Sequence, residues 1–310
     1  MENTRAKTTR NSLILLLTAT IWGMAFVSQS KGMDYMHPFT FNGVRSLIGA
    51  AGILVYILIS RKIAGDKAAK LDWKLNVRAG LLCGIFLTTA STLQQFGIKY
   101  TSVGKAGFIT TLYIIFVPMF GIFLKKKVAP VVWAAAGMAA VGMYLLCMTE
   151  SLRLGAGDIM VFLCAIAFAI QIMTVDHYAA RIDGAVVSCI QFTVCGVVCC
   201  IGALIWGQPT FGQLQDGLGA LLYAGVLSCG VGYTLQIVGQ KGLNPTVAAL
   251  IMSLESVIAT ISGWIAYKIG FLSTDQTLTP RQIAGCVIVF AAVILVQLPP
   301  EWFRFGKKNA

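Results

Sequence analysis

The sequence contains few charged residues and very few histidines. Only 12% of its 310 residues are charged, about half of the ~25% that is typical of soluble domains. His37 and His177 are the two histidines. So few histidines argue against a metal site or an acid–base catalytic site built from them. The sequence holds no GxxxxGK[ST] motif, which excludes a Walker A site for ATP. These shortages argue against a soluble domain, an ATP-driven pump and an integral membrane enzyme, and we expect no metal and no cofactor.

The nine cysteines lack the spacing of a metal site. None belongs to a CxxC pair or to a cluster of cysteine and histidine, and Cys199 and Cys200 are simple neighbours. All nine lie in apolar stretches, where a free cysteine behaves as a small hydrophobic residue. We therefore expect buried free thiols.

Long apolar runs make up nearly the whole chain. The composition is 57% hydrophobic and the mean hydropathy is +0.79. An apolar run of 18 residues or more is long enough to cross a bilayer as a helix. The predicted spans are 11–30, 38–59, 75–97, 103–124, 129–148, 157–179, 185–206, 217–239, 244–268 and 280–298. The expected fold is an all-α, polytopic membrane protein with ten transmembrane helices.

The net charge of +12 is distributed unevenly between the two ends of these spans. With the N-terminus inside, seventeen of the 24 basic residues lie in cytoplasmic segments and five in external ones. This positive-inside bias places both termini in the cytoplasm and predicts a multi-pass protein of the cytoplasmic membrane. The basic charge then faces anionic lipids, and we expect no nucleic acid among the partners.

One short sequence occurs twice at a fixed distance. TLQQFGIK (Thr92–Lys99) and TLQIVGQK (Thr234–Lys241) share Thr, Leu, Gln, Gly and Lys at an offset of 142 residues. The matching continues through the following span and divides the chain into residues 1–150 (spans one to five) and 151–310 (spans six to ten). Five spans per half is an odd number, so the second half crosses the membrane in the opposite sense. Inverted repeats of this kind are typical of secondary transporters, although chance matching of apolar helices is the alternative.

Several segments resemble those of one known family. They are WGMAF (Trp22–Phe26), HPFT (His37–Thr40) followed by Arg45, YTSVGKAGFITTLYIIFVPMFG (Tyr100–Gly121) and NPTVAALIMSLESVIATISGW (Asn244–Trp264). Together they resemble EamA-type permeases of the drug/metabolite transporter superfamily. The resemblance implies ten spans in two inverted halves, a central cavity, and export or uptake of small metabolites by alternating access.

The sequence departs from the family pattern at the ninth span. The usual Glu-Pro is here Glu255-Ser256, which predicts a span without a proline kink. The acidic residue often found after the fourth and ninth spans is also absent. Details of gating taken from the family are therefore in question.

Glu255 is the acidic residue that we place deep within a span. It lies about 11 residues into the ninth predicted span, roughly 16 Å along the helix axis. A charge there costs about 2.5–3.5 kcal/mol, so it should face the bundle interior or a wet cavity. Glu255 could carry a coupled proton, bind a cationic group of the substrate, or be a purely structural residue. Its partner in the repeat alignment is Tyr113, whose ring can both stack and donate a hydrogen bond, so Tyr113 is also a predicted residue of the substrate site.

Arg45 lies about seven residues into the second predicted span. Its guanidinium could bind a carboxylate or phosphate of the substrate in bidentate fashion. Alternatively, it could cap backbone carbonyls or extend to the membrane surface. A third possibility is an ion pair between Arg45 and Glu255 across the bundle, which would explain how both are tolerated.

Amides and aromatic rings complete the predicted substrate site. Amide side chains within lipid must find partners, either on other helices or on a polar solute. Aromatic residues could form apolar walls, or could be ordinary packing. These predicted site residues are Gln95, Gln171 and Gln236 for the amides, and Trp22, Phe26 and Tyr233 for the aromatic residues.

The favoured function is a secondary transporter with a binding cavity at the membrane midplane. The substrate would be a small polar or amphipathic metabolite, such as an amino acid or a related compound, and net transport would be export. A flippase for lipids or lipid-linked sugars is the alternative, and an integral membrane enzyme is a distant second one. The expected partners are the small-molecule substrate and membrane lipids, with the chain acting as a monomer or a homodimer.

Overall fold

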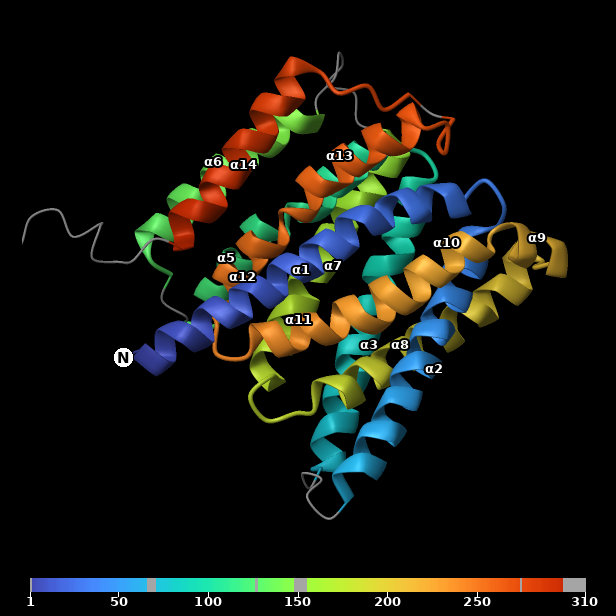
Figure 1. Ribbon diagram of the computed structural model, residues 1–310, viewed down its shortest axis with the longest axis horizontal. Coiled ribbons are helices and arrows are strands. Elements are labelled where there is room, and N and C mark those ends of the chain that lie inside the picture. Colours follow the sequence, from blue (N-terminus) through green and yellow to red (C-terminus); the bar gives the residue numbers. More distant parts are fainter. Residues whose placement is uncertain (1, 66–70, 126–127, 148–154, 274, 298–310) are drawn as a thin grey trace, which may run out of the picture.

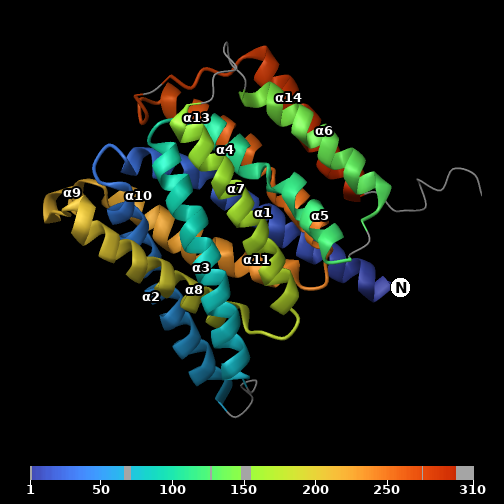
Figure 2. The same ribbon diagram turned by 180° about the vertical axis from the view of Figure 1, so that it is seen from behind.

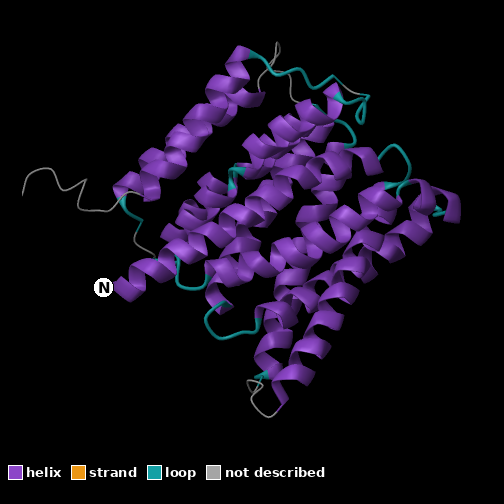
Figure 3. Ribbon diagram, viewed as in Figure 1, coloured by secondary structure: helices purple, strands orange, loops and turns teal. Residues whose placement is uncertain are grey.

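The chain folds into a bundle of helices, shown in Figure 1. The computed structural model describes residues 2–65, 71–125, 128–147, 155–273 and 275–297. Every regular element in these residues is helical (Figure 3). The elements are α1 (Glu2–Gly32), α2 (Pro38–Ala64), α3 (Trp73–Ile98), α4 (Val103–Thr111), α5 (Tyr113–Phe123), α6 (Pro130–Cys147), α7 (Ala156–Tyr178), α8 (Gly184–Gly202), η2 (Ala203–Gly207), α9 (Phe211–Asp216), α10 (Leu218–Leu222), η3 (Tyr223–Gly232), α11 (Tyr233–Gln240), α12 (Pro245–Met252), α13 (Glu255–Lys268) and α14 (Pro280–Gln297).

The helices are long and apolar enough for a membrane protein. Within the described residues, eight helical segments have the length and composition to cross a bilayer, and two shorter apolar helices cover 130–142 and 280–295. Each of the ten predicted spans coincides with one of these segments. Large apolar side chains are exposed along them, which suits contact with lipid better than contact with water. The predicted fold class is confirmed.

The two halves of the chain are interleaved in space. Helix α2 packs on α8, α6 packs on α14, and α3 packs on α7, while α1 packs on α11 and α13. Figures 1 and 2 show the α6–α14 pair at one end of the bundle and the α2–α8 pair at the other. Each of these contacts joins a helix of the first half to one of the second. This arrangement is consistent with two inverted repeats.

The fourth and ninth spans are each broken near their middle. The fourth consists of α4 and α5, and the ninth of α12 and α13. At the first break, the Leu112 amide donates to the Ile109 carbonyl at 3.2 Å. At the second, the Leu254 amide donates to the Ile251 carbonyl at 3.3 Å. Both bonds span three residues instead of four, and the two pairs are related by the 142-residue offset of the repeat.

Side-chain hydroxyls satisfy carbonyl groups at both breaks. Thr111 Oγ1 donates to the Phe108 carbonyl at 2.8 Å, and Ser253 Oγ donates to the Leu250 carbonyl at 2.7 Å. These pairs also obey the 142-residue offset. Carbonyls freed within a membrane need such partners, because no water is present there. The expectation of an unkinked ninth span, based on Ser256 in place of proline, is therefore wrong: hydroxyl-capped turns interrupt both spans without help from a proline at that position.

Some features of the predicted topology fall outside the described residues. The predicted boundary between the halves, at 150 and 151, is one of them. Others are basic residues that we used for the orientation: Lys67, Lys70, Lys126, Lys127, Arg153, Arg304, Lys307 and Lys308.

Candidate functional site

A small cavity lies at the centre of the bundle, between helices of both halves. It is walled by α1, α2, α3, α8, η3, α11 and α13. The space left for water at its centre is about 30 Å³, enough for about two water molecules at ~10–15 Å³ each. Its lining residues are Trp22, Phe26, Gln29, Asn42, Arg45, Leu87, Ser91, Gln94, Phe192, Ser228, Cys229, Tyr233 and Glu255.

Aromatic rings form one side of the cavity. The rings of Trp22 and Tyr233 have their centroids 4.5 Å apart, and Phe192 meets Tyr233 edge-on at 5.0 Å. The Trp22 indole Nε1 donates to the Ser228 carbonyl in η3 at 3.4 Å. A Cβ at Gly232 would lie 2.6 Å from that Nε1, so only glycine leaves room for the indole. The rings therefore hold one fixed, tilted arrangement that can receive an apolar group.

Arg45 and Asn42 form the core of the polar side. They lie three residues apart on α2 and so project from the same face. Arg45 Nε donates to Asn42 Oδ1 at 3.0 Å, and Asn42 Nδ2 donates to Ser91 Oγ on α3 at 3.1 Å. The guanidinium also lies over the Phe41 ring, 5.4 Å from its centroid. Although only 5% of Arg45 is exposed, these contacts leave part of its guanidinium for a ligand in the cavity.

Glu255 lines the cavity from α13, at the break in the ninth span. It is the first residue of α13, where the positive end of a helix dipole favours a carboxylate. Its Oε1 accepts a hydrogen bond from the Tyr113 hydroxyl at 3.1 Å, and the two residues are 4% and 2% exposed. These are the residues that the repeat alignment equates, 142 positions apart.

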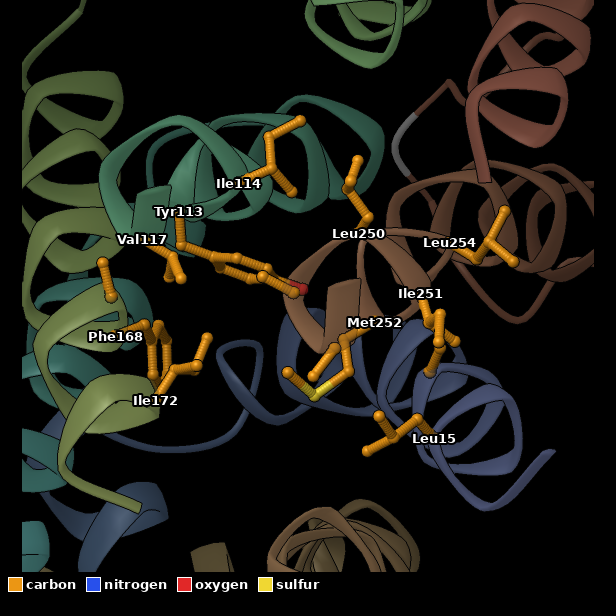
Figure 4. Close-up of a cluster of buried hydrophobic side chains, with 14 of the residues drawn as sticks. Leu15, Tyr113, Ile114, Val117, Phe168, Ile172, Leu250, Ile251, Met252 and Leu254 are labelled. Atoms are coloured by element: carbon orange, nitrogen blue, oxygen red, sulfur yellow. The ribbon is translucent and has the colours of Figure 1, made fainter. Parts of the chain in front are cut away.

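Tyr113 approaches this carboxyl from outside the cavity. Figure 4 shows its ring extending from α5 past Phe168 and Ile172 on α7, with the hydroxyl directed toward the segment that carries Met252. The ring belongs to the apolar core and its hydroxyl to the polar contact. Tyr113 therefore supports the cavity wall from behind.

Arg45 and Glu255 share the cavity but do not pair with each other. Among the described residues, ion pairs join Lys31 to Asp34 and Lys105 to Asp158. The predicted ion pair between Arg45 and Glu255 is therefore not formed. A buried guanidinium and a buried carboxyl group thus face the same space from different helices.

The structure brings only some of the predicted site residues to the cavity. Trp22, Phe26, Arg45, Tyr233 and Glu255 line it, whereas Tyr113, Gln95, Gln171 and Gln236 do not. The Gln236 amide donates to Gln171 Oε1 at 3.2 Å, which joins α11 to α7. The Gln95 amide donates to a backbone carbonyl of α1 at 3.3 Å. These amides link helices to one another in this conformation.

Eight lining residues were not among the predicted site residues, although patterns point to some of them. Gln29 follows Trp22 and Phe26 at helical spacing, and Gln94 is the repeat partner of Gln236. Ser228 and Cys229 lie in the π-helix η3, whereas its repeat counterpart in α3 is a regular α-helix. No sequence pattern predicts the π-helix in the second half. Such π-helical turns often occur at functional sites.

A charged clamp closes the bundle at one end. Lys105 Nζ at the start of α4 lies 2.6 Å from Asp158 Oδ2 in the first turn of α7, and Thr101 Oγ1 donates to Asp158 Oδ1 at 2.9 Å. The side chain of Asp158 is 4% exposed. The clamp holds the connection between α3 and α4, in the first half, against α7, the first helix of the second half.

The cavity's chemistry suits binding of a solute. Within the described part of the chain, no group of three or more His, Cys, Asp or Glu side chains is placed to hold a metal ion. What the cavity offers is one cationic group, one carboxyl group, several amides and hydroxyls, and an aromatic wall. Such a set can orient a small polar molecule through its charges and pack its apolar part.

Relatives of similar length are named as transporters. The chain is 27% identical over 290 residues to an uncharacterized transporter of Archaeoglobus fulgidus, covering 92% of this chain and 84% of that protein. It is 24% identical over 294 residues to the uncharacterized transporter YwfM of Bacillus subtilis, with 94% of each chain covered. A solved crystal structure of a protein that is 16% identical superposes with a TM-score of 0.73, over 96% of this chain and 99% of that one, and shows the same fold.

The family profile matches twice along the chain. The EamA-like transporter family is matched by residues 10–148 and again by residues 155–298. The two matches correspond to the two halves that interleave in the bundle, and the family is one of transporters rather than of enzymes. The chain is therefore a multi-pass membrane transporter that belongs to the EamA-like transporter family.

Proposed function

We propose that this transporter carries a small zwitterionic metabolite of the amino-acid type by alternating access. The observation that carries the proposal is the unpaired placement of Arg45 and Glu255 on one buried cavity. A charged group near the middle of a membrane costs about 2.5–3.5 kcal/mol, and a ligand of opposite charge offsets part of that cost. A zwitterion satisfies both groups at once, with its carboxylate toward Arg45 and its ammonium toward Glu255. The aromatic wall receives its side chain.

The size of the cavity supports a mechanism with more than one conformation. About 30 Å³ is too little for an amino acid, so the walls must separate when the substrate enters. The two interleaved, inverted halves provide elements that can rock around a central site. The clamp between Lys105 and Asp158 closes one end, and it must open when the cavity faces that side.

The orientation in the membrane is part of the same proposal. The positive-inside bias supports a cytoplasmic location for both termini. The clamp end then faces outward, and the 179–183 connection faces the cytoplasm. Net export stays a prediction from the sequence.

Transport by proteoliposomes tests the proposal with matched substrates. Each amino acid of a panel is compared with the amine that lacks its carboxylate and with the acid that lacks its amine. Losing a hydrogen bond to a charged group costs about 1.5–3 kcal/mol, or roughly 10- to 150-fold in affinity. Arg45→Gln should weaken transport of the amino acid and the acid while sparing the amine. Glu255→Gln should weaken transport of the amino acid and the amine while sparing the acid.

Two exposed residues provide the controls. Arg78→Gln and Asp275→Asn make the same chemical changes outside the cavity and should leave transport unaltered. Equal loss of all three compounds in either cavity variant would refute the proposed binding roles. Transbilayer movement of labelled lipid by the wild-type chain, without transport of any soluble compound, would favour the flippase alternative. An imposed pH gradient tests proton coupling, which should disappear in Glu255→Gln if that carboxyl carries the proton.

A further inference from the structure

A second and larger hollow opens at the end of the bundle opposite the clamp. This groove, the α2–α8 groove, has a volume of about 570 Å³. Its walls are the last turns of α2, the start of α3, the 180–183 connection with the first turn of α8, and one side of α11 with Lys241. The Asp183 amide donates to Asn76 Oδ1 at 2.9 Å, which ties two of these walls together. The groove is separate from the central cavity, and no lining residue is common to both.

Three cations line the groove, and none belongs to an ion pair among the described residues. Lys241 Nζ donates to the Ile182 carbonyl at 3.3 Å, and Arg181 Nη2 donates to the His177 carbonyl at 3.4 Å. Within the described part of the chain, the Arg61 guanidinium has no hydrogen-bond partner. Among the described residues, the groove thus presents three cations that form no ion pair.

The two carboxylates of the groove are engaged elsewhere. Asp72 Oδ1 accepts from the Leu75 amide at 3.0 Å and begins α3. Asp183 Oδ1 accepts from the Ala185 and Val186 amides at 2.9 and 3.2 Å and begins α8. A carboxylate at a helix N-terminus is stabilised by the helix dipole and its amides. Backbone amides therefore hold one oxygen of each carboxylate, and the three cations of the groove outnumber its two carboxylates.

The groove lies at the depth of lipid headgroups. Helix α2 has 27 residues, so it is about 40 Å long, against a hydrocarbon core of about 30 Å. Its last turns, with Arg61, therefore extend beyond the hydrocarbon into the headgroup layer. Apolar side chains flank the same turns and are open to lipid: Tyr56 is 61% exposed and Ile63 is 81% exposed.

We propose that the α2–α8 groove binds one anionic phospholipid, with its phosphate between Arg61 and Arg181 and an acyl chain along Tyr56 and Ile57. Charge complementarity selects the anionic headgroup, because basic pockets between transmembrane helices bind such lipids. The exposed apolar face of α2 continues the groove into the hydrocarbon, which suits a lipid better than a free anion. Such a lipid bridges a first-half helix and a second-half connection. The inference does not depend on which solute the transporter carries.

Native mass spectrometry of the purified full chain tests this site. The probes are phosphatidylglycerol and phosphatidylcholine with the same acyl chains, added to the detergent-solubilised protein. Wild type should retain one phosphatidylglycerol more tightly than any phosphatidylcholine. Each cation near the membrane surface contributes about fivefold, so Arg61→Gln/Arg181→Gln should bind phosphatidylglycerol about 30-fold more weakly. Each single variant should show about a fivefold loss, which keeps the test decisive if the double variant is poorly folded.

A matched control removes the same charge from the same end of the molecule. Lys74→Gln/Arg78→Gln changes two exposed cations of α3 that do not line the groove, and retention should stay within about twofold of wild type. An equal loss in the control would overturn the proposal, since charge at that end would then act diffusely. Equal retention of phosphatidylcholine would also overturn it, because the headgroup would then be irrelevant. Displacement of phosphatidylglycerol by millimolar inorganic phosphate would assign the groove to a soluble anion instead.

Discussion

Removing the hydroxyl of Tyr113 tests how strongly the two broken spans depend on each other. In Tyr113→Phe the ring keeps its packing against α7, but the 3.1 Å hydrogen bond to Glu255 is lost. Tyr113 is the partner of this carboxyl among the described hydrogen bonds, and Glu255 is 4% exposed. A buried acceptor left without its donor costs about 1–3 kcal/mol. We expect the free energy of unfolding to fall by that amount.

A double-mutant cycle separates this contact from other effects of the two substitutions. Glu255→Leu removes the acceptor, and Tyr113→Phe/Glu255→Leu removes both partners. Once the carboxyl is absent, the tyrosine hydroxyl contributes less to the free energy of unfolding. The double variant should therefore be about 1–2 kcal/mol more stable than the sum of the single losses predicts. Glu255→Gln keeps an oxygen that can accept from Tyr113 and should cost less than Glu255→Leu.

Equilibrium unfolding in detergent micelles, followed by tryptophan fluorescence, provides the measurement. Tyr100→Phe is the control, because Tyr100 is 64% exposed and the change should stay within about 0.5 kcal/mol. Additivity of the two single changes within about 0.5 kcal/mol would refute the reasoning, as would an unchanged stability of Tyr113→Phe.

Three further changes address the clamp, a helix crossing and a helix cap. Lys105→Met should lower the free energy of unfolding by about 1.5–3 kcal/mol, because Asp158 loses a charged partner. Wild-type stability in Lys105→Arg, measured in the same unfolding assay, would support the ion pair. Wild-type stability in Lys105→Met would contradict it. Gly97→Ala places a Cβ 2.8 Å from a backbone oxygen of α7 and should cost about 1–3 kcal/mol, whereas Gly52→Ala meets nothing within 4 Å and should not lower stability. His37 Nδ1 accepts from the amide of the second residue of α2 at 3.3 Å, and burial, followed by the charge of Lys99, lowers the pKa of its imidazole. A lowered pKa means that the unfolded chain binds the proton more readily than the folded chain. The contribution of neutral His37 to the free energy of unfolding is therefore present above about pH 6.5 and is lost as the pH falls below it. His37→Asn caps the helix without titrating, so its free energy of unfolding should fall less than that of wild type between pH 7.5 and 5.5.

Much of the fold could be predicted from the sequence because the relevant signals are local. Pro38 and Pro280 begin α2 and α14, and Ser102 and Asn244 cap α4 and α12 with their side chains. The last two are repeat partners, so the same local signal begins both helices. Span lengths follow from bilayer thickness, which is independent of the packing.

The site could be predicted only in part, because a transmembrane helix is apolar on nearly every face. In a soluble helix, an apolar stripe shows which side faces the core, but lipid removes that distinction. Arg45 and Glu255 were identifiable because a charge has few tolerable positions in a membrane. Gln236 could not be distinguished from Gln94, although one pairs with Gln171 and the other lines the cavity. The deciding factor is the neighbour that each helix meets, which is a tertiary property.

The contact between Tyr113 and Glu255 shows what the chain gains from having two halves that are not identical. Its two partners are 142 residues apart, which is the repeat offset, so each residue contacts its own counterpart in the other half. In a homodimer of identical halves, this position would set glutamate against glutamate, or tyrosine against tyrosine. Two carboxylates in one buried site repel each other, and one must hold its proton. In this chain the two copies differ, and a donor opposes an acceptor. One chain with two non-identical halves can therefore form a hydrogen bond at a position where two identical halves would set like groups against each other.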